Sequence, residues 1–293
     1  MSKFIGSGVA IVTPFKKDSS IDYDAFEKLI EFQIENKTDA IIVCGTTGEA
    51  STLSKKEHLE VVRFCVEKVN KRIPVIAGSG KNNTREAIEV SQECEKLGVD
   101  GLLVVTPYYN KATQKGLINY YSRIAESVEL PIILYNVPPR TAVNIEPNTV
   151  LELSKIKNIV GIKEASGNIS QIANVCSMCD EDFYVYSGND DQIVPIMALG
   201  GKGVISVVAN VVPRDTHNIT ELFLEGKIKE SRELQFKMRD LISAMFIEVN
   251  PVPVKTAIGL MGYGDCVFRE PLINIEDCNL EILKTSLKDY NLI

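Results

Sequence analysis

The chain has 293 residues, of which 45% are hydrophobic and 24% charged, and its formal net charge is −7. This composition is typical of a globular protein with a large core, and the negative charge argues against a surface that binds nucleic acid or an anionic membrane. The sequence has no apolar stretch long enough to span a membrane and no apolar leader, so we expect a cytoplasmic protein.

Short apolar runs that end in Gly, Pro, Ser or Thr recur along the chain, and we expect each to form a buried strand. The eight runs cover residues 8–14, 40–48, 74–80, 101–107, 131–138, 159–166, 183–189 and 203–210. Amphipathic segments that we expect to be helical separate them, among them residues 22–35, 55–70, 84–97 and 115–127. Thr84 is the expected N-cap of the helix at residues 84–97.

Buried strands that alternate with helices indicate a parallel sheet covered on both faces. Eight such units predict a (β/α)8 barrel, the TIM barrel fold, over residues 1–218, with a helical C-terminal region over residues 219–293. Helices are expected there at residues 228–246 and 254–261. A doubly wound sheet is the alternative, but no G-x-G-x-x-G fingerprint follows the first strand.

Lys163 lies within the apolar run N-I-V-G-I-K-E-A-S. A lysine rarely enters a buried strand, because its ammonium group loses hydration there. Desolvation favours the neutral amine, which is the form that attacks a carbonyl to make a Schiff base. The alternative is a lysine at the strand end that reaches water and pairs with Glu164.

In a TIM barrel the active site lies at the C-terminal ends of the strands. The polar residues expected there are Thr46, Thr47, Thr106, Tyr109, Tyr135, Asn136, Arg140, Lys163, Ser187, Asn189 and Asn210. A glycine cluster around Lys202 could bind phosphate, but it precedes the eighth strand and so belongs to the opposite end.

Three features of this end of the barrel suit the binding of carboxylates and the transfer of protons. The loop Gly45 to Gly48 offers two hydroxyls and close backbone approach for a carboxylate, or is an ordinary tight turn. Tyr135 can shuttle protons, or belongs to the core. Arg140 can hold a carboxylate with both arms of its guanidinium, or forms a surface salt bridge.

Metal and redox chemistry find little support. The seven cysteines are an odd number, which suits reduced thiols, and Cys176 and Cys179 form a lone C-x-x-C pair. The two histidines, His58 and His217, are too few for a typical zinc-dependent lyase. We therefore expect no metal and no organic cofactor.

Five motifs in this order resemble the dihydrodipicolinate synthase family of pyruvate-dependent class I aldolases. They are G-T-T-G-E (45–49), V-T-P-Y-Y-N (105–110), Y-N-V-P-P-R-T (135–141), G-I-K-E-A-S (161–166) and Y-S-G-N-D (186–190). The resemblance implies condensation of pyruvate with L-aspartate-4-semialdehyde in lysine and diaminopimelate biosynthesis. It also implies a homotetramer built as a dimer of dimers.

The resemblance implies a role for each matching residue. Lys163 would form the Schiff base, and Tyr135 would move protons through Thr46 to Tyr109 of a neighbouring subunit. Thr47 and a backbone contact from Ile205 would bind pyruvate, and Arg140 would hold the semialdehyde carboxylate. Gly188 would be a further substrate-binding residue.

Two other functions stay open. A related aldolase or lyase could act on a sugar acid or sialic acid, although Arg140 has no purpose with a polyol substrate, and the resemblance implies Ser-Thr in sialic acid lyases where this chain has Thr46-Thr47. A barrel without catalysis is the second alternative, and the combination of Lys163, Tyr135 and the Gly45–Gly48 loop argues against it.

The resemblance also implies an allosteric lysine cleft between subunits. The matching residues are Ala50, Ser51, Lys55, His58, Asn82, Glu86 and Tyr108. Lysine-sensitive relatives carry histidine where this chain has Lys55, and a second ammonium group beside the ligand's own would repel it. We therefore expect weak or absent feedback inhibition by lysine, unless Lys55 points to solvent.

Overall fold

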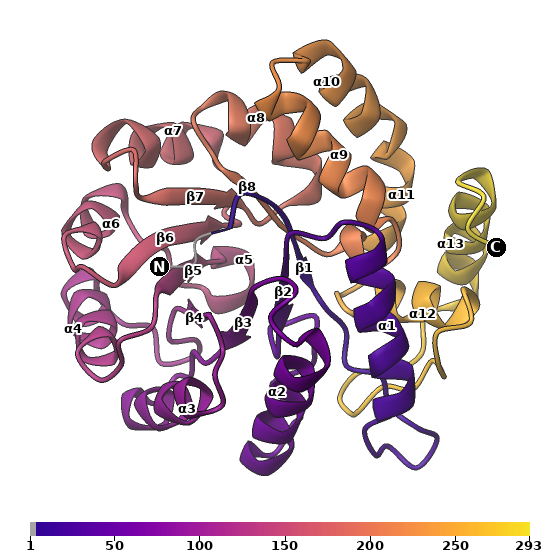
Figure 1. Cartoon of the computed structure of the whole chain (residues 1–293), viewed down its shortest axis with the longest axis horizontal. Helices are drawn as coiled ribbons and strands as arrows, with labels where there is room; N and C mark the ends of the chain where they lie inside the picture. Colours follow the sequence, from indigo (N-terminus) through magenta and orange to yellow (C-terminus); the bar gives the residue numbers. More distant parts are fainter. Residues whose placement is uncertain (1–3) are drawn as a thin grey trace.

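Eight parallel strands form a closed barrel in a computed structural model that describes residues 4–293 (Figure 1). The strands are β1 (Gly6–Ala10), β2 (Ala40–Val43), β3 (Val75–Gly78), β4 (Gly101–Val105), β5 (Ile132–Asn136), β6 (Ile159–Glu164), β7 (Tyr184–Ser187) and β8 (Gly203–Ser206). Each pairs with the next along the chain, and β8 pairs with β1. The predicted TIM barrel is confirmed.

Helices follow the strands, and most of them cover the outside of the barrel (Figure 1). They are α1 (Tyr23–Glu35), α2 (Lys55–Val69), α3 (Thr84–Lys96), α4 (Gln114–Ala125), α5 (Pro138–Thr141), α6 (Pro147–Ser154), α7 (Ile169–Met178) and α8 (Ile193–Ala198), with short 3₁₀ turns η1 (Asp190–Gln192) and η2 (Val208–Asn210). The expectation that Thr84 caps α3 was wrong: the Asn83 side chain accepts from the Arg85 N–H, so Thr84 is the first helical residue.

Five further helices complete the chain: α9 (Pro213–Leu224), α10 (Ile228–Lys237), α11 (Arg239–Met245), α12 (Val252–Leu260) and α13 (Asp277–Asp289). The expected division between residues 218 and 219 falls inside α9, which packs against β1 and β8 and is therefore the last helix of the barrel. The single helix expected over residues 228–246 is divided at Met238, between α10 and α11.

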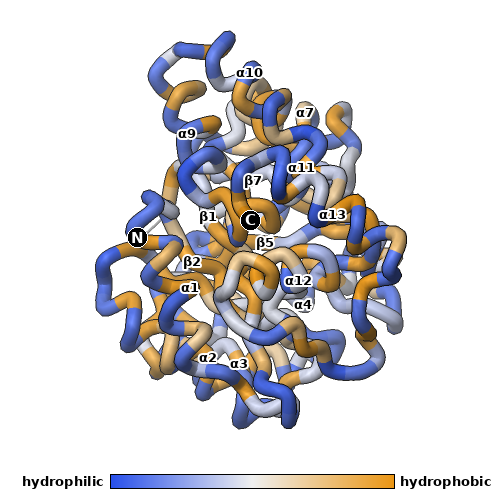
Figure 2. Tube along the Cα trace, turned by 90° about the vertical axis from the view of Figure 1, so that its right-hand side faces the viewer, coloured by the Kyte–Doolittle hydropathy of each residue, from blue (hydrophilic) through white to orange (hydrophobic). Residues whose placement is uncertain are grey.

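Apolar side chains fill two layers. The larger layer lies between the strands and the surrounding helices, and the smaller one fills the barrel interior with residues such as Ala10, Ile42, Ile133 and Ile205. Figure 2 shows the hydrophobic strand segments at the centre and hydrophilic segments toward the outside. Strands buried on both faces explain why the runs were almost continuously apolar.

The glycine cluster near Lys202 has a structural explanation. Gly203 begins β8 beside Gly6 of β1, and a side chain at Gly203 would come within 1.9 Å of the Gly6 carbonyl oxygen. Glycine therefore lets the two strands close the barrel. This contact lies at the N-terminal end of the strands, opposite the expected active site.

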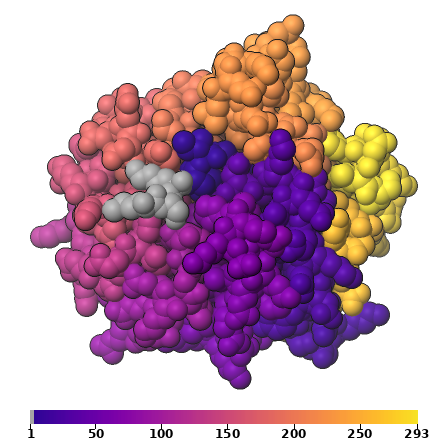
Figure 3. All heavy atoms as spheres, viewed as in Figure 1, coloured from indigo at the N-terminus to yellow at the C-terminus, as the bar shows by residue number. Residues whose placement is uncertain are grey.

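The C-terminal region lies against the N-terminal part of the barrel (Figure 3). The Tyr263 ring, just after α12, packs on Phe32 of α1 with 4.8 Å between ring centres. The Arg269 guanidinium donates to the backbone carbonyl of Ser19 at 2.8 Å. These contacts hold α12 close to the loops that follow the first strands.

Candidate active site

Lys163 and Tyr135 lie side by side where β6 and β5 end. The two are register partners, and the Lys163 Nζ lies 4.5 Å from the centre of the Tyr135 ring. Lys163 is 5% exposed and Tyr135 is 7% exposed. Lys163 therefore places an amine in the barrel mouth beside a phenol, and it does not extend into bulk water.

Glu164 forms a separate buried network. Both of its carboxylate oxygens accept from the Asn136 amide at 3.1 Å, and one accepts from the Ser166 N–H at 2.8 Å. Burial raises the pKa of Glu164, and these hydrogen bonds oppose the shift. Successive side chains in a strand point to opposite faces, so Glu164 is directed away from Lys163.

The Gly45–Gly48 loop leaves β2 toward this site. Thr47 is 2% exposed, and its hydroxyl oxygen accepts from the Asn250 amide at 3.0 Å. Thr46 is exposed. Gly78 allows close packing behind the loop, because a side chain there would come within 2.2 Å of the Cys44 carbonyl oxygen. The loop thus presents two hydroxyls, one of them fixed by a hydrogen bond.

Arg140 is positioned by α5, whose first residues are Pro138 and Pro139. Its Nη2 donates to the backbone carbonyl of Asn250 at 3.2 Å. Asn250 therefore contacts both Thr47 and Arg140. The sequence analysis missed Asn250, because nothing in the run before α12 indicated that it returns to the barrel mouth.

Two neighbouring cavities, which share lining residues, bring most of the predicted residues together. The inner cavity, of about 60 Å³, is lined by Thr46, Thr47, Tyr135, Arg140, Lys163 and Gly188 together with Phe246 and Asn250. The outer cavity, of about 290 Å³, shares Thr46, Tyr135 and Arg140 with it. The Lys163 amine therefore borders the inner cavity together with the carboxylate-binding candidates Thr47 and Arg140.

The other two predicted substrate contacts lie close by. A side chain at Gly188 would come within 3.1 Å of the Lys163 Cε and 2.6 Å of the Ala165 Cβ, so glycine leaves room for the lysine. Ile205 is fully buried in β8 within the barrel interior. Gly188 thus borders the site directly, whereas the Ile205 side chain belongs to the interior packing.

Tyr109 does not join its own chain's site. It is 91% exposed and has a backbone φ of 71°, which is in the left-handed region. It does not line either cavity. Within one chain the structure therefore brings Tyr135 and Thr46 together but leaves Tyr109 pointing outward.

Only part of the expected lysine cleft lines one cavity. Its members Ala50, Ser51, His58 and Tyr108 line the outer cavity. Burial lowers the pKa of His58 to about 4, with a further contribution from Lys81, so this ring is neutral at pH 7. Lys55 forms an ion pair with Glu89 at 3.2 Å, and both side chains are about half exposed. The ammonium of Lys55 therefore has a partner of its own.

Among residues 4–293 no group of three or more His, Cys, Asp or Glu side chains is placed to hold a metal ion. The seven cysteines are free thiols, Cys176 and Cys179 included. None of the helices in the described residues is long and apolar enough to cross a membrane.

Comparison with known proteins gives consistent matches over the whole chain. Residues 3–290 match the model of the dihydrodipicolinate synthetase family. A 4-hydroxy-tetrahydrodipicolinate synthase of Caldicellulosiruptor bescii is 54% identical, over 100% of this chain and 99% of the relative.

Two solved structures superpose closely. One is a chloride-inhibited dihydrodipicolinate synthase of Acinetobacter baumannii in complex with pyruvate, with a TM-score of 0.98, 44% identity and coverage of 99% of this chain and 100% of the other. The other is the enzyme of Cyanidioschyzon merolae with lysine bound, with a TM-score of 0.96, 38% identity and 99% coverage of both chains.

Proposed function

The chain belongs to the dihydrodipicolinate synthetase family, and from this we propose that it is a lyase that condenses pyruvate with L-aspartate-4-semialdehyde to give 4-hydroxy-tetrahydrodipicolinate. The reaction belongs to lysine and diaminopimelate biosynthesis. The observation that carries the proposal is the buried Lys163 amine beside Tyr135 in the cavity that Thr46, Thr47 and Arg140 also line. An amine, a phenol and carboxylate-binding groups are what this condensation requires.

In the proposed mechanism Lys163 attacks the ketone carbon of pyruvate, and water leaves to give a protonated imine. The imine withdraws electrons, so the pyruvate methyl group loses a proton and becomes the nucleophilic carbon of an enamine. That carbon attacks the semialdehyde carbonyl, whose oxygen takes up a proton. The substrate's amino group then attacks the imine carbon, closes the ring and releases Lys163.

We assign the remaining groups by what each can bind. Thr47 and the loop backbone hold the pyruvate carboxylate, and the fixed Asn250–Thr47 hydrogen bond supports this assignment because it leaves the Thr47 proton available to a ligand. Gly188 and the backbone of Ile205 border the pyruvate. Arg140 holds the semialdehyde carboxylate, and Tyr135 transfers protons through Thr46.

Tyr109 completes the proton relay of a neighbouring subunit in this proposal. Its 91% exposure supports a role outside its own chain. The working enzyme is then at least a dimer, and we propose a homotetramer arranged as a dimer of dimers. Both substrates are intermediates of amino-acid biosynthesis, so we place the enzyme in the cytoplasm.

A steady-state assay with purified protein tests this function. We expect turnover with pyruvate and L-aspartate-4-semialdehyde and negligible condensation of pyruvate with N-acetylmannosamine or glyceraldehyde. Efficient use of a sugar aldehyde with no turnover of the semialdehyde would favour the sugar-acid alternative. Arg140 argues against that alternative, because a polyol offers no carboxylate at its position.

We also propose that lysine binds at the outer cavity, whose lining includes Ala50, Ser51, His58 and Tyr108, with Asn82 and Glu86 as further expected contacts. The ion pair of Lys55 with Glu89 weakens the repulsion expected from Lys55. Weak or absent inhibition by lysine stays a prediction, and initial rates with added lysine test it. Lys55→His should increase the sensitivity if the charge of Lys55 matters.

A further inference from the structure

A buried ion pair joins the end of the carboxylate-binding loop to the C-terminal region. Glu49 directly follows Gly48, and its Oε1 lies 2.5 Å from the Nζ of Lys255 in α12. The side chains of Lys255 and Glu49 are 2% and 1% exposed. The two residues are 206 positions apart in the sequence, so this contact fixes two distant segments against each other.

The backbone of the loop needs such a contact. Cys44 and Glu49 flank the loop, and their φ angles of 54° and 51° are both in the left-handed region. Residues other than glycine adopt this conformation at a cost in free energy, and they keep it only where the surrounding structure holds them. At Glu49 the carboxylate is held by Lys255 and by the Arg269 N–H, at 3.3 Å from Oε2.

Lys255 has little freedom to move away from Glu49. Its Nζ lies 3.8 Å from the centre of the Phe15 ring and 5.5 Å from that of Phe268. Burial lowers the pKa of Lys255 to about 8, although Glu49 opposes the shift. Dehydrating two buried charges offsets much of their mutual attraction. A buried pair of this kind contributes little to stability, and its main effect is on position.

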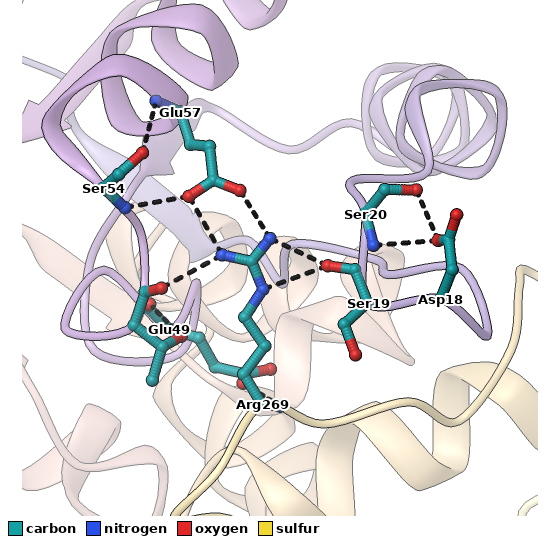
Figure 4. A network of polar contacts seen from close by, with 8 residues as sticks. Asp18, Ser19, Ser20, Glu49, Ser54, Glu57 and Arg269 are labelled. Carbon is teal, nitrogen blue, oxygen red and sulfur yellow. Dashed lines mark hydrogen bonds and ion pairs between the residues drawn. The ribbon is translucent and has the colours of Figure 1, made fainter.

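Arg269 extends the same connection to the barrel surface (Figure 4). Its guanidinium donates to both carboxylate oxygens of Glu57, at 2.6 and 3.1 Å, and to the Ser19 carbonyl. Glu57 in turn forms the capping box at the start of α2 with Ser54. The segment after α12 is therefore tied to the chain that follows the Gly45–Gly48 loop, at Glu49 and Glu57, and to the β1–α1 connection at Ser19.

We propose that Glu49 and Lys255 are positioning residues of the pyruvate site. Their ion pair holds the Gly45–Gly48 loop at the distance from Lys163 at which Thr47 binds the pyruvate carboxylate. Helix α12 and the turn before it are then part of the machinery that binds pyruvate, through the contacts of Lys255 with Glu49 and of Asn250 with Thr47. This inference rests on the proposed function.

Glu49→Asp tests the proposal directly, because it keeps the negative charge and draws the carboxylate back by one methylene. We expect the KM for pyruvate to rise about tenfold, since small displacements of positioning groups have effects of this size. The KM for the semialdehyde should stay within about twofold of the wild type. An unchanged pyruvate KM in the folded variant would overturn the proposal.

The double variant Glu49→Gln/Lys255→Met separates position from stability, because it leaves no unpaired buried charge. We expect a melting temperature near that of the wild type and a pyruvate KM that stays raised about tenfold. A wild-type pyruvate KM there would also overturn the proposal, and whichever variant folds decides the question.

Arg72→Gln is the matched control. It removes the ion pair between Arg72, in the turn after α2, and Glu31 of α1, and we expect wild-type kinetics. Borohydride trapping with the wild-type protein shows which claim has failed. If wild-type protein forms no imine with pyruvate, the proposed function fails; if it does, and the Glu49 variants bind pyruvate normally, the positioning role fails.

Discussion

Tyr135 and Lys163 face each other across the β5–β6 pair, with the Lys163 Nζ 4.5 Å from the centre of the Tyr135 ring. In the proposed mechanism the phenol therefore stands beside the amine when pyruvate, imine and enamine exchange protons. The ring and the hydroxyl can be separated by mutation, because phenylalanine keeps the packing and removes the acid–base group.

We expect Tyr135→Phe to lower kcat by about 10²- to 10⁴-fold with little change in melting temperature, which is the range for loss of a general acid–base group. Tyr186→Phe is the control within the same barrel interior, because its hydroxyl donates to the Phe4 carbonyl at 2.8 Å, away from Lys163. That variant should lose about 0.5–1.5 kcal/mol of stability and keep its kcat. Equal kcat values in the two variants would argue against proton transfer by Tyr135.

Arg140→Ala should separate the two substrates. We expect the pyruvate imine to form normally, while kcat/KM for the semialdehyde falls roughly 10- to 150-fold, from the loss of about 1.5–3 kcal/mol in hydrogen bonds to a charged group. Arg214→Ala is the control, since Arg214 contacts the Glu35 carbonyl at the end of α1. Unchanged semialdehyde kinetics in Arg140→Ala would remove Arg140 from the site.

The proposed role of Tyr109 in a neighbouring subunit can be tested by mixing two variants. Tyr109→Phe and Tyr135→Phe should each be weakly active alone, and mixing them under conditions that exchange subunits should restore activity. The gain is expected because a mixed oligomer contains sites that have both tyrosines. Mass spectrometry of the mixture establishes that subunits have exchanged. No recovery in exchanged oligomers would mean that Tyr109 does not serve a neighbouring subunit.

The contact of His217 with Asp39 should make the free energy of unfolding depend on pH, independently of catalysis. Its Nδ1 lies 2.9 Å from the Asp39 carboxylate near the N-terminal end of the barrel, and this hydrogen bond raises the pKa of His217 above 6.5. The folded state therefore favours the protonated ring. The stabilising contribution is fully present below about pH 6.5 and is lost as pH rises through the folded-state pKa.

Thermal unfolding of the wild type and His217→Gln tests this sign. The difference in melting temperature should be largest near about pH 6 and smaller near about pH 8.5. Activity per folded molecule should be the same in both proteins, because His217 lies outside the cavities at the barrel mouth. A difference that grows with pH would contradict the assignment.

The barrel could be predicted from the sequence because its signals are local. Each strand is a short apolar run, and the eight observed strands lie at or close to the expected positions. β1 differs most, since it begins at Gly6 and ends at Ala10, where the expected run began at Gly8. The register with β8, from Gly6↔Gly203 onward, sets where β1 begins. Pairing with a segment so distant in the sequence cannot be predicted from the residues of a single apolar run.

The residues that support the site were not predictable in the same way. Lys163, Tyr135 and Arg140 each follow or end a recognisable strand, so their place at the barrel mouth followed from the fold. Asn250 and Lys255 reach the mouth through contacts with Thr47 and Glu49 over 203 and 206 positions. No periodicity or spacing encodes such a contact, because it depends on how α12 packs against the finished barrel.

The chemistry of Lys163 is the central claim, and borohydride reduction in the presence of pyruvate tests it most directly. Reduction traps an imine as a stable amine, and peptide mass mapping then locates the added group. We predict that one equivalent of reduced pyruvate is found on Lys163, that Lys255 and all other lysines are unmodified, and that Lys163→Ala neither traps pyruvate nor turns over. Labelling of a different lysine, or full activity of Lys163→Ala, would contradict the account.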